Sequence, residues 1–102
     1  MVKGYWIAQV DVSDEHGHGA YAKAAMEYLQ RQGAKTLVVS PRQGRYEVVE
    51  GVPRSRRLIQ EFPDYETASA AYHSEEYQQI RKLRQNTATV DLVIVEGFDP
   101  SL

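Results

Sequence analysis

The stretch over residues 54–84 constrains the fold more than any other part of the chain. Its first nine residues, 54–62, alternate as in a strand, with one face formed by Leu58, Gln60 and Phe62 and the other by Arg57, Ile59 and Glu61. Pro63 ends this strand, and Asp64 is placed to cap a helix that follows at once. Ser74, followed by two glutamates, is a second N-cap signature. The stretch therefore predicts a strand followed by a helix that breaks and restarts at Ser74.

The rest of the chain predicts one more helix and several strands. Residues 1–12 alternate as a strand whose apolar face carries Trp6, Ala8, Val10 and Val12. A helix is expected from a cap at Ser13 or Asp14 to Gly33, with a frayed or late first turn because Gly17 and Gly19 disfavour helix. Residues 35–40 form a β-branched strand, 41–44 a turn and 45–50 a short returning strand. Residues 89–96 are the most apolar strand, which favours a central place in the sheet.

This order predicts an α+β, ferredoxin-like βαββαβ sandwich, in which an antiparallel sheet carries two helices on one face. The 102 residues are expected to form a single domain, 1–102. Two helices cover only one face of such a sheet, and the other face would carry Ile7 and Ile59 beside polar side chains. We expect a second copy of the chain to cover it, giving a homodimer.

Composition excludes several classes of function. The net charge is −2, with 12 basic and 14 acidic residues, which gives no electrostatic reason to expect nucleic acid or an anionic membrane as a partner. The chain has no cysteine, so disulfides and thiolate zinc sites are excluded. No apolar run approaches the length of a membrane span, and a signal peptide is not expected. We expect a cytoplasmic protein without a metal or cofactor.

Three motifs resemble a known family: Gly-Tyr-Trp-Ile-Ala at 4–8, Glu-Phe-Pro-Asp-Tyr-Glu-Thr-Ala at 61–68, and Tyr-His-Ser-Glu-Glu-Tyr-Gln at 72–78 with Arg84 behind it. Together they resemble the family of domain of unknown function 1330, within the dimeric α/β-barrel superfamily. The resemblance implies a ferredoxin-like protomer that pairs sheet to sheet into a barrel. Superfamily relatives include cofactor-free monooxygenases, haem-degrading enzymes, isomerases and proteins with no known chemistry. The sequence departs from the family pattern at 16–19.

The polar and aromatic residues suggest a site, and each has a structural alternative. Histidines two apart, such as His16 and His18, do not share a helix face, which favours a solvated or structural role over a metal site. Arg54 and Arg56 are interpreted as solvated edge residues, whereas Arg57 lies on one strand face with Glu61, as a structural ion pair or as part of a site. The remaining candidates are residues of an aromatic-walled pocket or of the core and surface: Trp6, Tyr65, Tyr72, Tyr77, His73 and Arg84.

Two hypotheses of function follow. In the first, the homodimer binds a small aromatic or carboxylate ligand between the sheet and the second helix, either without chemistry or as a cofactor-free oxygenase- or isomerase-like enzyme. Glu61 or His73 would move a proton, and Trp6, Arg57, Tyr72, Tyr77 and Arg84 would bind the ligand. In the second, the chain is a non-catalytic dimerisation or interaction module. A cavity of roughly 300 Å³ or more at Trp6 and Arg84 would favour the first over the second.

Overall fold

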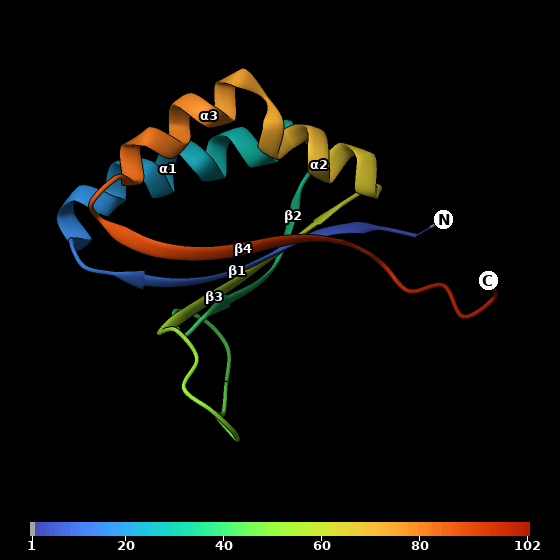
Figure 1. Cartoon of the computed structure of the whole chain (residues 1–102), viewed down its shortest axis with the longest axis horizontal. Helices are drawn as coiled ribbons and strands as arrows, with labels where there is room; N and C mark the ends of the chain where they lie inside the picture. Colours follow the sequence, from blue (N-terminus) through green and yellow to red (C-terminus); the bar gives the residue numbers. More distant parts are fainter. Residues whose placement is uncertain (1) are drawn as a thin grey trace.

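The computed structural model describes residues 2–102, which form one four-stranded antiparallel sheet with its helices on one face (Figure 1). The sheet order is β2-β3-β1-β4. In chain order the elements are β1 (Gly4–Val12), α1 (Glu15–Arg31), β2 (Lys35–Ser40), β3 (Arg56–Phe62), α2 (Tyr65–His73), α3 (Glu75–Arg81), the short 3₁₀ helix η1 (Lys82–Arg84) and β4 (Ala88–Glu96). The predicted α+β, ferredoxin-like architecture is confirmed, with the second helix divided into α2 and α3.

The alternation along β1 sets the two faces of the sheet. β1 pairs with β3 on one side and with β4 on the other. Trp6, Ala8 and Val10 are buried beneath the helices, whereas Ile7 points to the opposite face and is 38% exposed. Within residues 2–102 no helix covers that opposite face, which we call the open face (Figure 1). The prediction of one covered and one open face is confirmed.

The helix boundaries lie where the polar caps indicated. Asp14 Oδ1 accepts from the Gly17 amide at 2.9 Å, and Asp64 Oδ1 accepts from the Thr67 amide at 2.7 Å. Ser74 accepts from the Tyr77 amide at 3.0 Å and so starts α3 directly after α2. Such caps satisfy amides that have no partner within the helix.

The expectation of a frayed first turn in α1 is wrong, because the helix is regular from Glu15. Gly17 allows the start of α1 to pack closely against Asp14 and Thr87. A Cβ at this position would lie 2.5 Å from Asp14 Oδ2 and 3.1 Å from Thr87 Cγ2. The glycine costs helix propensity, but it allows the start of α1 to approach the chain at Thr87.

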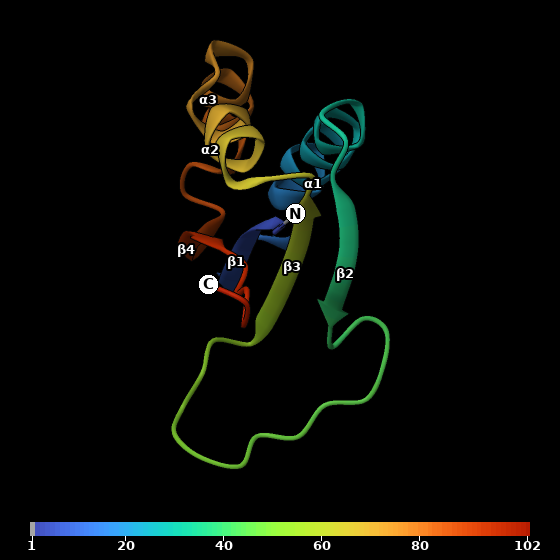
Figure 2. The same cartoon turned by 90° about the vertical axis from the view of Figure 1, so that its right-hand side faces the viewer.

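Three strand predictions are also wrong. The strand β4 lies at an edge of the sheet and not at its centre. Its apolar character comes from having apolar side chains on both faces, and Val93 on the open face is 50% exposed. Residues 45–50 form no strand, and β3 starts at Arg56 rather than at residue 54. Residues 41–55 instead form a loop that projects away from the helices (Figure 2), and residues 45–50 within it are all exposed.

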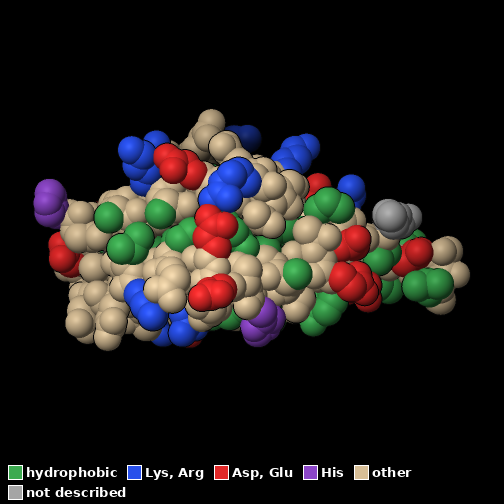
Figure 3. Space-filling model, turned by 90° about the horizontal axis from the view of Figure 1, so that it is seen from above, with side chains coloured by type: hydrophobic (Ala, Val, Ile, Leu, Met, Phe, Trp, Pro, Cys, Tyr) green, Lys and Arg blue, Asp and Glu red, His purple; other side chains and the backbone are tan. Residues whose placement is uncertain are grey.

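The core lies between the sheet and the paired helices. Trp6 and Phe62 meet Tyr28, Leu29 and Tyr77 there, together with Ala68 and Ala71. Tyr28 is only 2% exposed, and its hydroxyl donates to the Ala71 carbonyl at 2.9 Å. On the outer side of the helices, acidic and basic side chains are interspersed (Figure 3). No helix within residues 2–102 is both long enough and apolar enough to cross a membrane.

Candidate functional site

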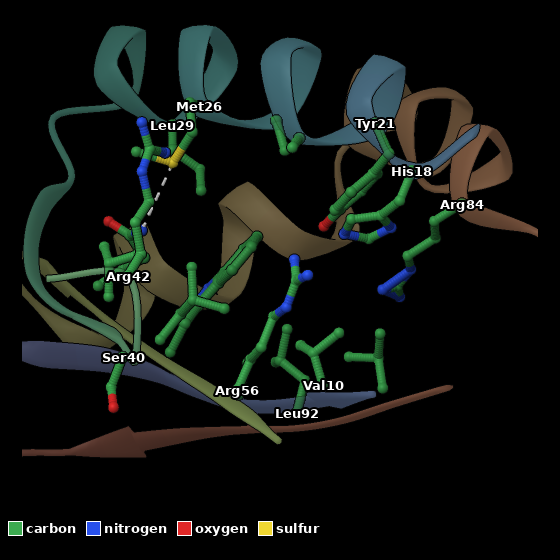
Figure 4. Close-up of a pocket in the computed structure, with 18 of the residues that line it drawn as sticks. Val10, His18, Tyr21, Met26, Leu29, Ser40, Arg42, Arg56, Arg84 and Leu92 are labelled. Atoms are coloured by element: carbon green, nitrogen blue, oxygen red, sulfur yellow. Dashed lines mark hydrogen bonds between the residues drawn. The ribbon is translucent and has the colours of Figure 1, made fainter. Parts of the chain in front are cut away.

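A cavity of about 410 Å³ lies between α1 and the sheet (Figure 4). It is comparable in size to the pockets in which proteins bind small molecules. Most of its lining is apolar, with a few polar groups from different elements. The lining residues are Trp6, Ala8, Val10, His18, Tyr21, Ala22, Ala25, Met26, Leu29, Val39, Ser40, Pro41, Arg42, Arg56, Leu58, Gln60, Arg84, Val90 and Leu92.

The cavity exists because α1 stands away from the sheet. α1 packs mainly against α3 and η1, whereas α2 packs on β1, β3 and β4. The side chains that α1 turns to the cavity include the small Ala22 and Ala25, which leave the space beneath the helix open. Figure 4 shows α1 above this space and the strands below it, with side chains entering from both sides.

Arg84 is the most unusual polar residue of the cavity. Within residues 2–102, its Nη1 is the buried side-chain nitrogen or oxygen without a hydrogen-bond partner. The guanidinium carbon lies 5.2 Å from the centre of the Tyr21 ring, a cation–π distance. Figure 4 shows the side chain reaching into the cavity from η1. A guanidinium with one buried, unused donor is suited to an anionic ligand.

Tyr21 is held in place by a hydrogen bond to a buried tyrosine, Tyr77. The hydroxyls of Tyr21 and Tyr77 are 2.6 Å apart, and Tyr77 is fully buried. Burial, followed by the influence of Tyr21, raises the pKa of Tyr77, so its hydroxyl keeps its proton. The pair fixes the wall of the cavity against which Arg84 lies.

His18 enters the cavity from the first turn of α1 (Figure 4). The residue is 9% exposed, and its Nδ1 lies 3.2 Å from Thr87 Oγ1. Burial lowers the pKa of His18, and the positive charges of Arg56 and Arg84 lower it further, against the opposing influence of Glu15. The imidazole is therefore neutral at neutral pH.

Arg56 brings a second cation to the cavity from β3 (Figure 4). It forms an ion pair with Glu15 at the start of α1. The interpretation of Arg56 as a solvated edge residue is wrong, because β3 is an inner strand and Arg56 lines the cavity. Arg54 forms ion pairs with Asp11 at 2.9 Å and with Asp91 at 2.7 Å. Arg56 follows the two-residue period that puts Leu58 on the helix side of the sheet.

Among the residues proposed from sequence, Trp6 and Arg84 line the cavity. Tyr72 and Tyr77 lie behind Trp6 in the packed layer, with ring centres 5.7 Å and 5.1 Å from the indole. The indole Nε1 donates to the Ala68 carbonyl at 2.7 Å, which fixes the orientation of the Trp6 ring. The cavity thus lies beneath the first helix, whereas the sequence indicated the second.

Arg57 and Glu61 lie on the open face, away from the cavity. They do not pair with each other within residues 2–102. Arg57 donates to Ser40 Oγ at 2.9 Å and to the Arg54 carbonyl at 2.9 Å. Glu61 accepts from the Tyr5 hydroxyl at 3.2 Å. The structure therefore does not bring these two residues together with Trp6 and Arg84.

The two other histidines lie outside the cavity. His73 is exposed at the end of α2, with its ring 5.2 Å from that of Tyr72. His16 is exposed at the start of α1, and residues 2–102 contain no group of three or more side chains placed to hold a metal ion. Sequence reasoning missed His18 as a cavity residue. The signal was its helical spacing from Tyr21, Ala25 and Leu29, which all face the sheet.

Comparison with known proteins gives a family and a fold. A family model described as a domain of unknown function, DUF1330, matches residues 3–98. No curated protein matches the chain significantly.

Several solved structures have a similar fold, including the following three. A protein of unknown function from Rhodopseudomonas palustris is 16% identical, with a TM-score of 0.66 over 97% of this chain and 85% of that one. SnoaB, a cofactor-independent oxygenase from Streptomyces nogalater, is 12% identical, with a TM-score of 0.68 over 97% and 96%. A putative antibiotic biosynthesis monooxygenase from Nitrosomonas europaea is 13% identical, with a TM-score of 0.54 over 95% and 92%. At these identities the likeness establishes the fold alone.

Proposed function

For this chain, which belongs to the DUF1330 family, a domain of unknown function, we propose the binding of a small aromatic or carboxylate anion in the cavity beneath α1. The observation that carries the proposal is Nη1 of Arg84, a buried donor without a partner within residues 2–102, at a cavity of about 410 Å³. An orphaned charged donor destabilises the free protein, and an anion would satisfy it.

The cavity walls suit a flat, partly apolar ligand. Trp6 and Tyr21 supply aromatic surface, and Leu58 and Leu92 supply aliphatic surface from the sheet. Arg84 would take the anionic group at one end. The ligand would thus lie between the first helix and the sheet, rather than beside the second helix.

Thermal unfolding with benzoate as the probe tests the proposal. Benzoate should raise the melting temperature of the parent protein and of Arg81→Met, but not that of Arg84→Met. Arg81 is a matched control because it is an exposed arginine of α3 that does not line the cavity, and its Nη1 donates to the Tyr72 hydroxyl. Equal shifts in all three proteins, or no shift in the parent, would contradict the proposal.

A cofactor-free, oxygenase- or isomerase-like reaction on the bound ligand is the finer form of this function. SnoaB, a cofactor-independent oxygenase, shares the fold, and this is support by analogy only. The support from this chain is a neutral imidazole at His18 in the same cavity as the Arg84 cation. Oxygen uptake with hydroxylated aromatic compounds tests the oxygenase form. No uptake by the parent above that of Arg84→Met would contradict it.

The alternative is a non-catalytic dimerisation or interaction module. A module needs no internal space, and a cavity of about 410 Å³ with converging cations favours the ligand-binding function.

We also propose that a second copy of the chain covers the open face. Ile7 and Val93 are 38% and 50% exposed there, and Ile59 lies between β1 and β2 on the same face. Apolar surface of this kind is stabilised by burial at about 25 cal/mol per Å². A two-fold axis would place the same apolar strip of each copy against the other.

A further inference from the structure

We infer that His18 is the proton acceptor of the cavity, with Nε2 as the accepting atom and a weakly acidic hydroxyl, such as that of a phenol or an enol, as the donor. This inference rests on the proposed function, because the donor is the bound ligand. It adds a residue and an atom that carry chemistry to a site so far described only as binding an anion.

The hydrogen bonds around Thr87 decide which nitrogen of His18 carries the proton. Thr87 Oγ1 donates to the Arg84 carbonyl at 2.8 Å, so its hydroxyl hydrogen is already used. Only lone pairs of Oγ1 then face His18 Nδ1, which lies 3.2 Å away. Nδ1 must therefore be the donor and carry the hydrogen. In a neutral imidazole this leaves Nε2 without a hydrogen and able to accept one.

Thr87 is itself held at several points, so this arrangement is rigid. Its amide donates to the Arg84 carbonyl at 3.0 Å, and its own carbonyl accepts from the amides of Ser13 and Asp14 at 2.8 Å and 3.1 Å. The turn before β4 is thereby attached to the start of α1, the helix that carries His18. A fixed outer partner that sets the tautomer is the arrangement a histidine base requires.

The groups around His18 act on both partners of the transfer. The groups around the ring are Glu15 on its own helix, Arg56 from β3, Arg84 from η1 and the ring of Tyr21, whose centre lies 5.3 Å away. Burial, and after it the charges of Arg56 and Arg84, lower the pKa of His18, so the imidazole is free of a proton before the ligand binds. The two cations would repel the imidazolium that forms, and they would stabilise the negative charge that the ligand acquires at the same time. Within residues 2–102 the ring makes its side-chain hydrogen bond through Nδ1, which leaves Nε2 for the ligand.

The step itself is a single proton transfer. The O–H bond of the ligand breaks, an N–H bond forms at Nε2, and the electron pair stays on the ligand oxygen. The product is an imidazolium that keeps its Nδ1 hydrogen bond to Thr87, next to a ligand anion that faces Arg84. The overall charge of the complex does not change, so no proton enters or leaves solution.

The tautomer can be tested without a ligand. Long-range nitrogen–proton correlation spectra of the free protein should show His18 with its hydrogen on Nδ1. Thr87→Val, which removes the acceptor, should yield a mixture of tautomers, and Thr87→Ser should restore the parent spectrum. A parent ring with its hydrogen on Nε2, or an unchanged ring in Thr87→Val, would overturn the inference.

The transfer is tested with 4-nitrophenol, whose phenolate is coloured, at a pH about one unit below its pKa in water, where roughly tenfold more neutral phenol than phenolate is present. Absorbance counts the phenolate, and calorimetry in buffers of different ionisation enthalpy counts released protons. The parent should form phenolate on binding with no net proton release. His18→Asn keeps an amide that can donate to Thr87, and this variant should bind the probe as neutral phenol or release one proton for each phenolate formed.

The outcomes separate this inference from the proposed function. Phenolate formed by the parent with one proton released, or probe bound only as neutral phenol, would overturn the role of His18 and leave the ligand site standing. No binding of the probe at millimolar concentration would overturn the ligand site, and the base with it.

Discussion

Replacing Arg84 with methionine should stabilise the free protein, although it removes a residue of the proposed site. Methionine keeps a long apolar side chain over Tyr21 and removes the buried Nη1 that has no partner within residues 2–102. An unsatisfied buried donor costs about 1–3 kcal/mol. The lost cation–π contact with Tyr21 is worth about 0.5–1 kcal/mol. The net expectation is a gain of about 1 kcal/mol, which corresponds to an increase of roughly 4–8 °C in the melting temperature of a domain of this size.

The same substitution should lose the stabilisation that a ligand gives. At a benzoate concentration of about 100 times its Kd, the parent should gain about 2.7 kcal/mol, and the order of the two melting temperatures should reverse. The assay is thermal unfolding followed by circular dichroism, with and without benzoate. The control, Arg81→Met, should stay within about 0.5 kcal/mol of the parent in both conditions. A free Arg84→Met protein that melts several degrees below the parent would refute the reasoning, because Nη1 would then be a satisfied structural donor.

Three further changes test the fold, the open face and His18. Tyr28→Phe removes the hydroxyl that donates to the Ala71 carbonyl near the end of α2. It should lower the free energy of unfolding, measured with urea, by about 1–1.5 kcal/mol. A decrease below about 0.5 kcal/mol would count against a stabilising role of this hydrogen bond. Ile59→Lys places a charge on the open face and should give a monomer in sedimentation at concentrations where the parent is a dimer. The control Leu83→Lys, which places the same charge on η1, should remain a dimer. A monomeric parent would disprove the pairing. The pKa of His18 is lowered in the folded state, so the unfolded chain takes up its proton first, and stability should fall as pH drops below about 6.5. In His18→Asn this loss should be absent from urea titrations between about pH 8 and pH 5.5, above the range in which carboxylates titrate, and an identical loss would exclude His18 as its source.

Local chemistry made the element boundaries predictable. Asp14, Asp64 and Ser74 each satisfy amides three residues ahead, and such bonds depend on the sequence within one turn. The two-residue period likewise placed Trp6 on the helix side and Ile7 on the open face. The ferredoxin-like order followed from these elements and from the family resemblance.

The position of the site depended on packing that no local pattern carries. The sequence does not indicate that α1 packs on α3 and η1 and stands away from the sheet, so the cavity beneath it was not predictable. Trp6 and Arg84 were predicted because they are a large aromatic and a cation beside the second helix. Arg57, Glu61 and His73 were grouped with them because of their residue types. In the structure, Arg57 and Glu61 lie on the open face of β3, and His73 lies at the end of α2. Arg56 was within reach of sequence reasoning, since the period that faces Leu58 inward also faces Arg56 inward.

The glycine at position 17 shows how local propensity and the site oppose each other. An alanine there would favour the helix by about 1 kcal/mol, yet its Cβ would lie 3.1 Å from Thr87 Cγ2. Thr87 is the residue whose hydroxyl sets the hydrogen on His18 Nδ1 and whose carbonyl holds the start of α1. Separating the helix from this turn would lengthen the contact between His18 and Thr87 and leave the tautomer unset. The glycine at position 17 is therefore explained by the histidine that this turn carries into the cavity, because Gly17 provides the space for the contact with Thr87.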